Sequence, residues 1–485
     1  MDVRSLEPTD LWNHFADLNQ VPRPSKKEEQ VIEFARRFGQ SLGLKTTVDD
    51  VGNVIINKPA TAGMENRIPI VMQSHLDMVC QKNNDTEFDF ETQGIEMVVT
   101  DDHVTAKGTT LGADNGIGVA AIMAVLSSTE ISHPPLEALF TIDEETGMTG
   151  ALGLQGGVLT GKILLNLDTE EDNELTIGCA GGVDVTLKGS YPSDQVHPGS
   201  QTVQLIVRGL KGGHSGIDIH LGRGNANKWM NRILWQLSRT VDLQIVKIDG
   251  GGLRNAIPRE SVAVIALPGS QMEKFKETVD AQRTELLAEY RITDPNAEIV
   301  IEESIPATDC LSEEFQRNLL AVLYTCPNGI HRMSPEIKDL VQTSNNLARV
   351  HLEANRYHIG CLTRSSVNSE RDDLANAITA SFQILGGETS FGGKYPGWTP
   401  KPESKIVALM SGLYEELFQA LPHVAACHAG LECGILGQNY PELEMISFGP
   451  NISGAHSPDE KVQISSVQKF WRYLLETLKR IPTVN

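Results

Sequence analysis

Short, almost continuous apolar runs alternate with helical segments through the first third of the chain, and this alternation constrains the fold more than any other feature of the sequence. The runs cover residues 54–57, 68–73, 136–142 and 162–168, and an apolar helical segment, GVAAIMAVLSS, lies between two of them. Strands that are apolar along their whole length are buried on both faces, as in parallel sheets covered by helices. The sequence therefore predicts an α/β domain with a mainly parallel sheet.

A different pattern begins near residue 200 and continues to about residue 395. Strand segments such as TVQLIVRGL and SVAVIALP alternate apolar with polar residues, and polar amphipathic helices lie between them. This pattern is typical of an α+β domain whose antiparallel strands have one solvated face. The order strand, helix, paired strands, helix occurs twice, which indicates two similar halves.

The α/β pattern returns after a segment rich in proline and glycine, KYPGWTPKPES at 394–404. A helical segment, the strand EMISFG and a final helix follow. We therefore expect one α/β domain made of residues 1–186 and 397–485, with an α+β domain of residues 187–396 inserted into it. Domain insertion is tolerated at surface loops, where the entry and exit points of the chain lie close together.

Composition excludes several classes of protein. The 485 residues include 63 acidic and 41 basic side chains, a net charge of -22, so nucleic acid and anionic membrane surfaces are not expected partners. The seven cysteines form no CxxC pair, which favours a reducing compartment and argues against a thiolate zinc site. The N-terminal residues lack the pattern of a signal peptide, and no run of 18 apolar residues occurs. We expect a soluble cytoplasmic enzyme.

Histidine or carboxylate side chains occur where three of the apolar runs end. His75 and Asp77 follow the run at 68–73, Glu144 and Glu145 follow the run at 136–142, and Asp168 ends the run at 162–168. Ligands of open α/β sheets bind at the carboxyl ends of the strands, so three such ends predict one crevice. A single acid could simply cap a strand or turn, whereas three in one domain favour a site.

Two further segments carry the same chemistry. Asp114 lies in the glycine-rich segment TTLGADNGIG, and His456 lies in GAHSPDE, which follows the strand EMISFG. The glycine-rich segment has no GxGxxG fingerprint, and its acid would repel a pyrophosphate, so a dinucleotide site is excluded. It could be an ordinary helix entry capped by Asn115. An acid in a glycine loop also suits a cation.

Together these segments supply two imidazoles and three carboxylates. Nitrogen and oxygen ligands without thiolate suit zinc, cobalt or manganese. Five ligands can serve two divalent ions if one carboxylate bridges them, and one hydroxide then makes the cluster neutral. Paired ions of this kind hold a water molecule and lower its pKa toward about 7.

Nine motifs give the chain a resemblance to the di-zinc exopeptidases, the family that includes carnosinase, aminoacylase and glutamate carboxypeptidase. They extend in order from the His75 motif to Glu460, which covers nearly the whole chain. The chain is most similar to the dipeptidase branch, whose members cleave many dipeptides, including Xaa-His. The motifs are SHLDMV, TTLGADNGIG, DEETGMTGALGLQG, NLDTEE, CAGG, GLKGGHSG, RNAIPRE, HAGLECG and GAHSPDE.

The resemblance implies two Zn²⁺ ions per chain, for which Co²⁺ or Mn²⁺ can substitute. It assigns Asp114 as the carboxylate that bridges the two ions. The remaining ligands would be His75 and Asp168 for one ion, and Glu145 and His456 for the other.

The same resemblance assigns Glu144 as the general base that acts on a zinc-bridged water, and Asp77 as the acid that orients a metal ligand. The spacing agrees with these roles. His75 and Asp77 are two residues apart and face the same side of an extended chain, so Asp77 can accept a hydrogen bond from the imidazole nitrogen that binds no metal. Glu144 and Glu145 diverge at a strand end, so one can bind metal while the other faces the water.

The resemblance also implies that the inserted α+β domain is a lid that binds substrate. His214 in GGHSG would donate to the oxyanion or substrate, and Arg364 in CLTRSS would hold the substrate carboxylate. Asn255 and Asn346 would make polar contacts, and Gly430 would offer its backbone. Each could instead be an ordinary loop or structural residue. We expect a homodimer, in which His214 acts either in its own chain or in the partner.

These observations predict a metal-dependent hydrolase of dipeptides with broad specificity. One alternative on the same fold is an aminoacylase-type amide hydrolase that acts on N-acyl amino acids. A remote alternative is a non-catalytic binding protein on the same scaffold, which would be expected to have lost a ligand or Glu144. All seven metal and catalytic positions are present.

Overall fold

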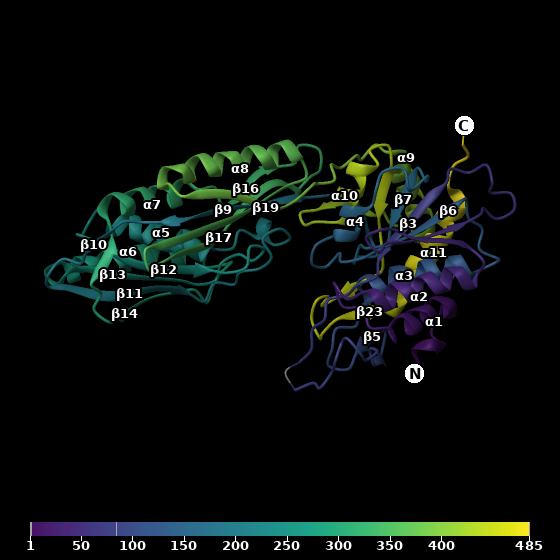
Figure 1. The fold of residues 1–485 in the computed structure, drawn as a ribbon, viewed down its shortest axis with the longest axis horizontal. Helices are drawn as coiled ribbons and strands as arrows, with labels where there is room; N and C mark the ends of the chain where they lie inside the picture. Colours follow the sequence, from purple (N-terminus) through teal and green to yellow (C-terminus); the bar gives the residue numbers. More distant parts are fainter. Residues whose placement is uncertain (1, 84, 485) are drawn as a thin grey trace. The chain divides into compact units, whose positions relative to one another are not determined.

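The computed structural model describes residues 2–83 and 85–484, which divide into two compact units (Figure 1). The first unit comprises Met1–Gly178, Trp398–Ala426 and Leu431–Asn485. The second comprises Cys179–Gly397 and the short segment Cys427–Gly430. Both ends of the chain therefore build the first unit. The role of the second unit as an inserted lid stays a prediction.

The first unit contains an eight-stranded sheet whose central strands are parallel. In spatial order its strands are β1 (Lys45–Val48), β2 (Val54–Lys58), β6 (Leu136–Thr141), β3 (Ile70–His75), β7 (Ile163–Asn166), β21 (Glu444–Ser447), β8 (Glu174–Cys179) and β20 (His423–Cys427). Strands β6, β3, β7 and β21 pair in parallel. Every residue of β3, β6 and β7 is buried, which explains why these strands are apolar along almost their whole length.

The prediction of a mainly parallel sheet is confirmed, but its first apolar run lies outside the parallel centre. Strand β2 is antiparallel to both β1 and β6. A tight turn joins β1 to β2, and Asp49 Oδ1 accepts hydrogen bonds from three successive backbone N–H groups of that turn, those of residues 51–53. A connection this short can join only antiparallel strands, so it decides the direction of β2.

The helices of the first unit pack around this sheet. They are α1 (Thr9–Leu18), α2 (Glu29–Ser41), α3 (Ala113–Ser127), α4 (Thr149–Gly153), α9 (Lys405–Phe418), α10 (Glu432–Asn439) and α11 (Ile464–Arg480), with a 3-10 turn, η1 (Val3–Ser5). Helix α3 is apolar on all sides and contacts both α1 and β3, while α9 contacts α11 and β21. Within the described ranges, no helix is both long enough and apolar enough to cross a bilayer.

A small four-stranded sheet supports the GAHSPDE segment. Its strands are β22 (Ile452–Ser453), β23 (Lys461–Gln463), β5 (His103–Ala106) and β4 (Met97–Thr100), in that spatial order. Strands β22 and β23 pair antiparallel and enclose residues 454–460. Both ends of the loop that carries His456 are thereby fixed to the same hairpin.

The second unit is built on one continuous antiparallel sheet. In spatial order its strands are β14 (Glu298–Glu303), β11 (Ser200–Arg208), β13 (Ser261–Pro268), β12 (Gln244–Gly251), β17 (Val341–Glu353), β18 (Arg356–Ser365), β9 (Gly181–Ser190) and β19 (Glu388–Tyr395), and β16 (Gly329–Met333) pairs with β17. Strands β10 (Ser193–Gln195) and β15 (Asp309–Leu311) form a separate pair. The alternating pattern of the middle segment corresponds to this sheet.

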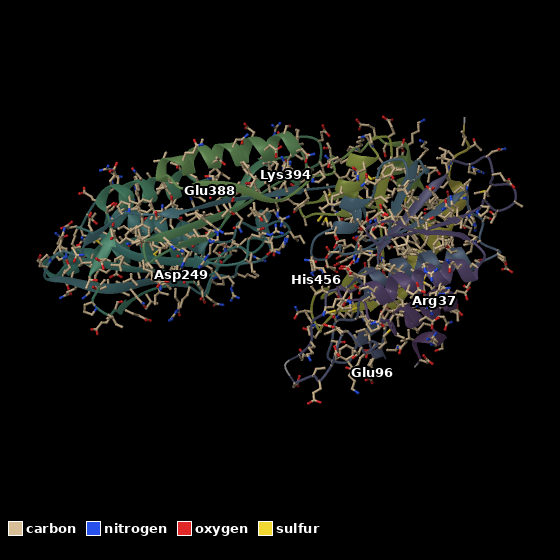
Figure 2. All side chains as sticks on the ribbon, in the orientation of Figure 1. Arg37, Glu96, Asp249, Glu388, Lys394 and His456 are labelled. Atoms are coloured by element: carbon tan, nitrogen blue, oxygen red, sulfur yellow. The ribbon has the colours of Figure 1, made fainter. Side chains whose placement is uncertain are left out.

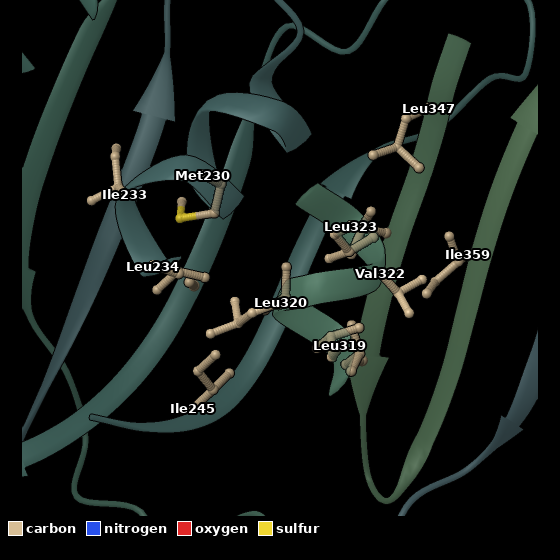
Figure 3. Close-up of a cluster of buried hydrophobic side chains, with 14 of the residues drawn as sticks. Met230, Ile233, Leu234, Ile245, Leu319, Leu320, Val322, Leu323, Leu347 and Ile359 are labelled. Atoms are coloured by element: carbon tan, nitrogen blue, oxygen red, sulfur yellow. The ribbon is translucent and has the colours of Figure 1, made fainter. Parts of the chain in front are cut away.

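Helices of the second unit pack on the sheet and close its core. They are α5 (Ala226–Leu237), α6 (Met272–Glu289), α7 (Glu313–Thr325) and α8 (Asn368–Phe382), with 3-10 turns η2 (Ile219–Leu221), η3 (Gly269–Gln271) and η4 (Gln383–Leu385). Buried side chains of α5 and α7 meet those of β12, β17 and β18 (Figure 3). The order helix, paired strands, helix, strand occurs as α5-β12-β13-α6-β14 and again, with β16 inserted, as α7-β17-β18-α8-β19.

Candidate active site

Three of the predicted site segments meet because the strands before them are parallel neighbours. His75 is the last residue of β3, Glu144 and Glu145 follow β6 by three and four residues, and Asp168 follows β7 by two. Strand β3 pairs in parallel with both β6 and β7, so the carboxyl ends of all three lie at one edge of the sheet. This edge is where an open α/β sheet binds its ligands.

Asp114 lies between two imidazole rings. Its Oδ1 is 3.2 Å from His75 Nε2, and its Oδ2 is 3.3 Å from His456 Nε2. His75 lies at the end of β3, and His456 lies in the loop between β22 and β23, so the aspartate faces two imidazoles from distant parts of the chain. A carboxylate with one oxygen toward each of two rings has the arrangement that a bridging ligand requires.

Each imidazole also faces a second carboxylate. His75 Nε2 is 3.5 Å from Asp168 Oδ1, and His456 Nε2 is 3.0 Å from Glu145 Oε2. The second oxygen of Glu145, Oε1, is buried and has no hydrogen-bond partner among the described residues. The side chain of His456 is 56% exposed (Figure 2), whereas the other four are largely buried. The five predicted metal ligands thus form one cluster that is open on the His456 side.

The charges of this cluster are strongly coupled. Burial acts to raise the pKa of Asp114, but hydrogen bonds from His456 and His75 outweigh burial and hold the pKa below its ordinary value. Hydrogen bonds to Asp114 and Glu145 raise the pKa of His456 to about 11. Burial raises the pKa of Glu145 and of Asp168. Without metal, protonated imidazoles therefore balance the carboxylates, and a cation can take over that task.

Asp77 ties His75 to the loop that carries the glutamate pair. Its buried carboxylate accepts the backbone N–H of Glu144 at Oδ1 (3.0 Å) and that of Glu145 at Oδ2 (3.2 Å), and Ser25 Oγ donates to Oδ2 (2.8 Å). His75 Nδ1 lies 3.3 Å from Asp77 Oδ1 and 3.1 Å from the Asp77 carbonyl oxygen. Because two acceptor oxygens face Nδ1, a neutral His75 ring carries its proton on Nδ1. The lone pair of Nε2 then points toward Asp114 and Asp168 and is free to bind a metal ion.

Glu144 is half-buried beside the cluster. Burial raises the pKa of the Glu144 carboxyl well above its ordinary value. The charge of His75 acts against this rise, and the negative charges of Asp168 and Glu145 add to it. Its backbone is fixed by Asp77, so the side chain extends from a rigid turn. A carboxyl group with a raised pKa can both accept and return a proton near neutral pH.

The alternative role of Asn115 as a helix cap does not by itself account for its contacts. Helix α3 begins after Gly112, and its backbone departs from helical geometry at Asp114 and Asn115. The Asn115 side chain instead donates to the Leu167 carbonyl (2.8 Å) and to Asp168 Oδ1. It therefore connects the glycine-rich segment to the end of β7 and orients one of the predicted ligands.

Glu432 makes structural contacts with the sheet of the first unit. Glu432 is fully buried, and its Oε2 accepts from Gln73 Nε2 and Thr141 Oγ1, both at 2.6 Å. Burial raises the pKa of Glu432 to about 8. Because Gln73 lies near the end of β3 and Thr141 ends β6, Glu432 joins the two strands beneath the cluster.

The second unit carries all five predicted substrate-binding residues. His214 Nδ1 accepts the backbone N–H groups of Gly216 (3.2 Å) and Ile217 (3.0 Å), which leaves the proton of the neutral ring on Nε2. Arg364 Nη2 lies 3.5 Å from that Nε2, and Arg364 Nε is buried without a hydrogen-bond partner among the described residues. Donor groups of two side chains therefore lie close together, a combination that suits an anion.

The remaining three predicted residues differ in their surroundings. The Asn346 side chain is buried and donates to the carbonyls of Arg254 (3.2 Å) and Ala256 (2.8 Å), so it holds the loop that carries Asn255. The Asn255 side chain is exposed. Gly430 is half-buried and ends the short segment of the second unit at 427–430.

Two aromatic side chains near Arg364 were not anticipated as functional. Tyr395 Oη accepts a hydrogen bond from Arg364 Nη1 at 2.8 Å. Buried His428 contacts Ser344 Oγ through Nε2 at 2.8 Å, and burial with the charges of Arg364 and His214 lowers its pKa to about 3. His428 is therefore neutral near pH 7 and adds no positive charge beside Arg364 and His214. Tyrosine at the end of an alternating strand gives no sequence signal for such a role.

Comparison with known proteins agrees with this geometry. The sequence pattern of Peptidase family M20/M25/M40 matches residues 71–480. The cytosol non-specific dipeptidase of Escherichia coli (strain K12) is 42% identical over 481 residues, covering 99% of each chain.

Solved structures extend the comparison. The aminoacylhistidine dipeptidase of Vibrio alginolyticus superposes with a TM-score of 0.92 at 43% identity, covering 100% of this chain and 99% of that one. The aminopeptidase PepT of Bacillus cereus, at 16% identity and a TM-score of 0.57 over 98% and 99% of the two chains, shares the fold.

Proposed function

The chain belongs to Peptidase family M20/M25/M40, and we propose that it is a metal-dependent dipeptidase of broad specificity, including Xaa-His dipeptides. The E. coli relative bears the name of a non-specific dipeptidase, and the V. alginolyticus relative that of an aminoacylhistidine dipeptidase. Both relatives cover almost the whole chain at more than 40% identity. Their names therefore support this substrate class over N-acyl amino acids.

One observation carries the proposal: Asp114 presents one oxygen to each of two imidazoles, and each imidazole faces a further carboxylate. The donor set suits a pair of zinc ions. It offers two ring nitrogens and three carboxylates with no thiolate, a set that zinc accepts and for which cobalt or manganese can substitute. The buried Glu145 Oε1 lacks a hydrogen-bond partner, as a metal ligand would. The residues fit two ions.

In this proposal His75 and Asp168 would hold one Zn²⁺, Glu145 and His456 would hold the other, and Asp114 would contribute one oxygen to each. When bound, the ions supply positive charge that polarises the scissile carbonyl and makes water more acidic. Glu144 would start as a base once that positive charge offsets the effect of burial on its carboxyl.

Glu144 then moves one proton through the reaction. It accepts a proton from water as the water oxygen attacks the carbonyl carbon. It returns that proton to the amide nitrogen as the C–N bond breaks, so the products are a free acid and a free amine. Asp77 keeps His75 and the Glu144 backbone in place during both transfers.

The second unit supplies the donors for negative charge. His214 Nε2–H is the proposed donor to the developing oxyanion, and the Arg364 guanidinium the proposed partner of the substrate carboxylate. Asn255, Asn346 and Gly430 remain proposed contacts nearby. Asn346 acts through the loop that it holds.

We further propose a cytoplasmic enzyme that acts as a homodimer on small dipeptides. The name of the E. coli relative supports the location. Sedimentation analysis would establish the oligomeric state. Mixing chains that lack His214 with chains that lack Glu144 would show whether His214 acts across a dimer, because only a shared site regains activity.

A substrate panel tests the proposal. Ala-His, β-Ala-His, Gly-Gly, a tripeptide and an N-acetyl amino acid would each be incubated with the zinc-loaded protein, and the released amines quantified. We expect cleavage of several dipeptides and little cleavage of the N-acetyl amino acid. Preferential cleavage of the N-acetyl amino acid would instead identify an aminoacylase-type hydrolase.

A further inference from the structure

A buried arginine joins two of the ligand-bearing segments. Arg23 is only 2% exposed and lies on the segment between α1 and α2. Its Nη1 donates to the carbonyls of Leu76 (3.1 Å) and Asp77 (3.2 Å), directly after His75. Its Nη2 donates to the Gly112 carbonyl at 2.6 Å, two residues before Asp114. One guanidinium therefore connects the segment that ends β3 to the segment that begins α3.

A buried glutamate holds the other side of the same segment. Glu460 is 2% exposed. Its Oε2 accepts the N–H groups of Leu111 (2.7 Å) and Gly112 (2.9 Å), and its Oε1 those of Ala113 (2.8 Å) and Asp114 (3.2 Å). Four successive donors at the start of α3 are thus satisfied by one carboxylate from the loop that carries His456.

The glycines of TTLGADNGIG fit the arginine. A Cβ atom at Gly112, where φ is +71°, would lie 2.3 Å from Arg23 Nη2, and a Cβ at Gly116 would lie 2.8 Å from the same atom. The segment therefore needs glycine at both positions so that the guanidinium can approach the backbone. This close approach gives the glycine-rich motif a structural explanation.

We propose that Arg23 and Glu460 are positioning residues that set the affinity of the metal pair by fixing Asp114 relative to His75 and His456. The inference rests on the proposed function. Arg23 spans the His75 and Asp114 segments, and Glu460 spans the His456 and Asp114 segments. The bridging carboxylate is held from both sides by groups of opposite charge, and each acts through the backbone rather than on a metal ion.

The substitution Glu460→Gln disrupts these four hydrogen bonds with little change in the size of the side chain. Each carboxylate oxygen accepts two N–H groups, so the amide nitrogen of glutamine faces two donors whichever way it turns. Two buried N–H groups then lose their acceptor, and the start of α3 must shift. Groups that orient metal ligands typically change metal affinity by about 10–100-fold when mutated.

Glu137 offers a matched control in the same sheet. It is 6% exposed, and its carboxylate accepts the backbone N–H groups of Thr160 and Gly161, both at 2.9 Å. It lies near the start of β6, whereas Glu145 follows the end of that strand. Its Oε1 accepts only from Thr160 Oγ1 (2.9 Å), a hydroxyl that can rotate to accept from an amide nitrogen. Glu137→Gln therefore removes the same buried charge far along the strand from the cluster, while both backbone N–H groups keep their acceptor.

The experiment compares Co²⁺ binding by the metal-stripped full chain, Glu460→Gln and Glu137→Gln, using a competing chromophoric chelator and the Co²⁺ absorption spectrum. We expect Glu460→Gln to melt at a lower temperature than Glu137→Gln, and only Glu460→Gln to bind Co²⁺ about 10–100-fold more weakly with an altered spectrum. Wild-type affinity and spectrum in folded Glu460→Gln, or equal losses in both variants, would overturn the proposal.

If Glu460→Gln does not fold, the same measurement is made on Arg23→Lys. The single ammonium group of lysine cannot donate at once to the segment after His75 and to the segment before Asp114, as the guanidinium does. Wild-type Co²⁺ affinity in Arg23→Lys would again overturn it. Failure of the proposed function can be distinguished from failure of the positioning role. A wild-type protein that binds no divalent metal and cleaves no dipeptide would refute both proposals. An active wild type with unaffected variants would refute only the positioning role.

Discussion

Asp77→Asn is the substitution whose effect the structure defines most fully. The new amide can turn two ways. With its nitrogen in the place of Oδ1, it would face two donors, the Glu144 N–H and His75 Nδ1–H. With its nitrogen in the place of Oδ2, it faces Ser25 Oγ, which can rotate to accept, and the Glu145 N–H. The second orientation leaves one donor unpaired and is the one we expect.

The magnitude follows from that orientation. One buried N–H without an acceptor lowers the free energy of unfolding by about 1–3 kcal/mol. The Asp77 carbonyl still accepts from His75 Nδ1 at 3.1 Å, so the ring keeps its tautomer. We therefore expect kcat/KM to fall about 10–100-fold, as for other groups that orient a metal ligand. The fall should be far smaller than the roughly 10⁴-fold loss that follows a wrong tautomer.

Steady-state kinetics on Ala-His at saturating metal, with urea unfolding of the metal-free protein, would measure both effects. Ser25→Ala is the control, because it removes one hydrogen bond to Asp77 and keeps the charge, with an expected loss of about 0.5–1.5 kcal/mol. Unchanged kcat/KM in Asp77→Asn would refute the orienting role of the carboxylate. A loss near 10⁴-fold would refute the claim that the backbone carbonyl preserves the tautomer.

Three further predictions use other parts of the site. Glu144→Ala should lower kcat about 10²–10⁴-fold while metal content, measured by mass spectrometry, stays at the wild-type value; loss of metal would mean that Glu145 is the base and Glu144 the ligand. Tyr395→Phe removes the acceptor of Arg364 Nη1 and should raise KM for dipeptides roughly tenfold with little change in kcat. Dipeptide amides, which lack the carboxylate, should show no such rise, and an equal rise for them would contradict the role of Arg364. Glu432 has its pKa raised by burial to about 8, so the folded metal-free protein binds more protons than the unfolded chain between about pH 4.5 and pH 8, and its stability falls as pH rises through that window. Glu432→Gln should remove up to roughly 5 kcal/mol of that fall, and equal pH slopes for the two proteins in urea unfolding would contradict the assignment.

The parallel centre of the first unit could be predicted because burial on both faces leaves a simple mark. The runs before His75, Glu144 and Asp168 are apolar throughout, and in the structure they form β3, β6 and β7. Once these strands are parallel, geometry alone brings their ends together. The direction of β2 was not predictable from its apolar run, because a short turn stabilised by Asp49 decides it.

Arg23 and Glu460 show why the rest of the site could not be predicted. Their partners are mostly backbone groups, and those of Glu460 lie more than 340 residues away in the chain. Backbone groups are the same at every position, so no pairing of side chains reveals such contacts. Asn115 is similar, since its amide reaches the end of β7 rather than its own helix. The one available signal was the glycine pair of TTLGADNGIG, which marks a close approach without naming what approaches.

Metal stoichiometry measured together with activity tests the central claim most directly. The purified protein would be analysed for metals, stripped with a chelator and titrated with Zn²⁺ while Ala-His hydrolysis is followed. We predict that hydrolysis is lost on stripping, returns as zinc is added, and reaches its maximum at two ions per chain. Hydrolysis by the stripped protein, or none with two ions bound, would contradict the account.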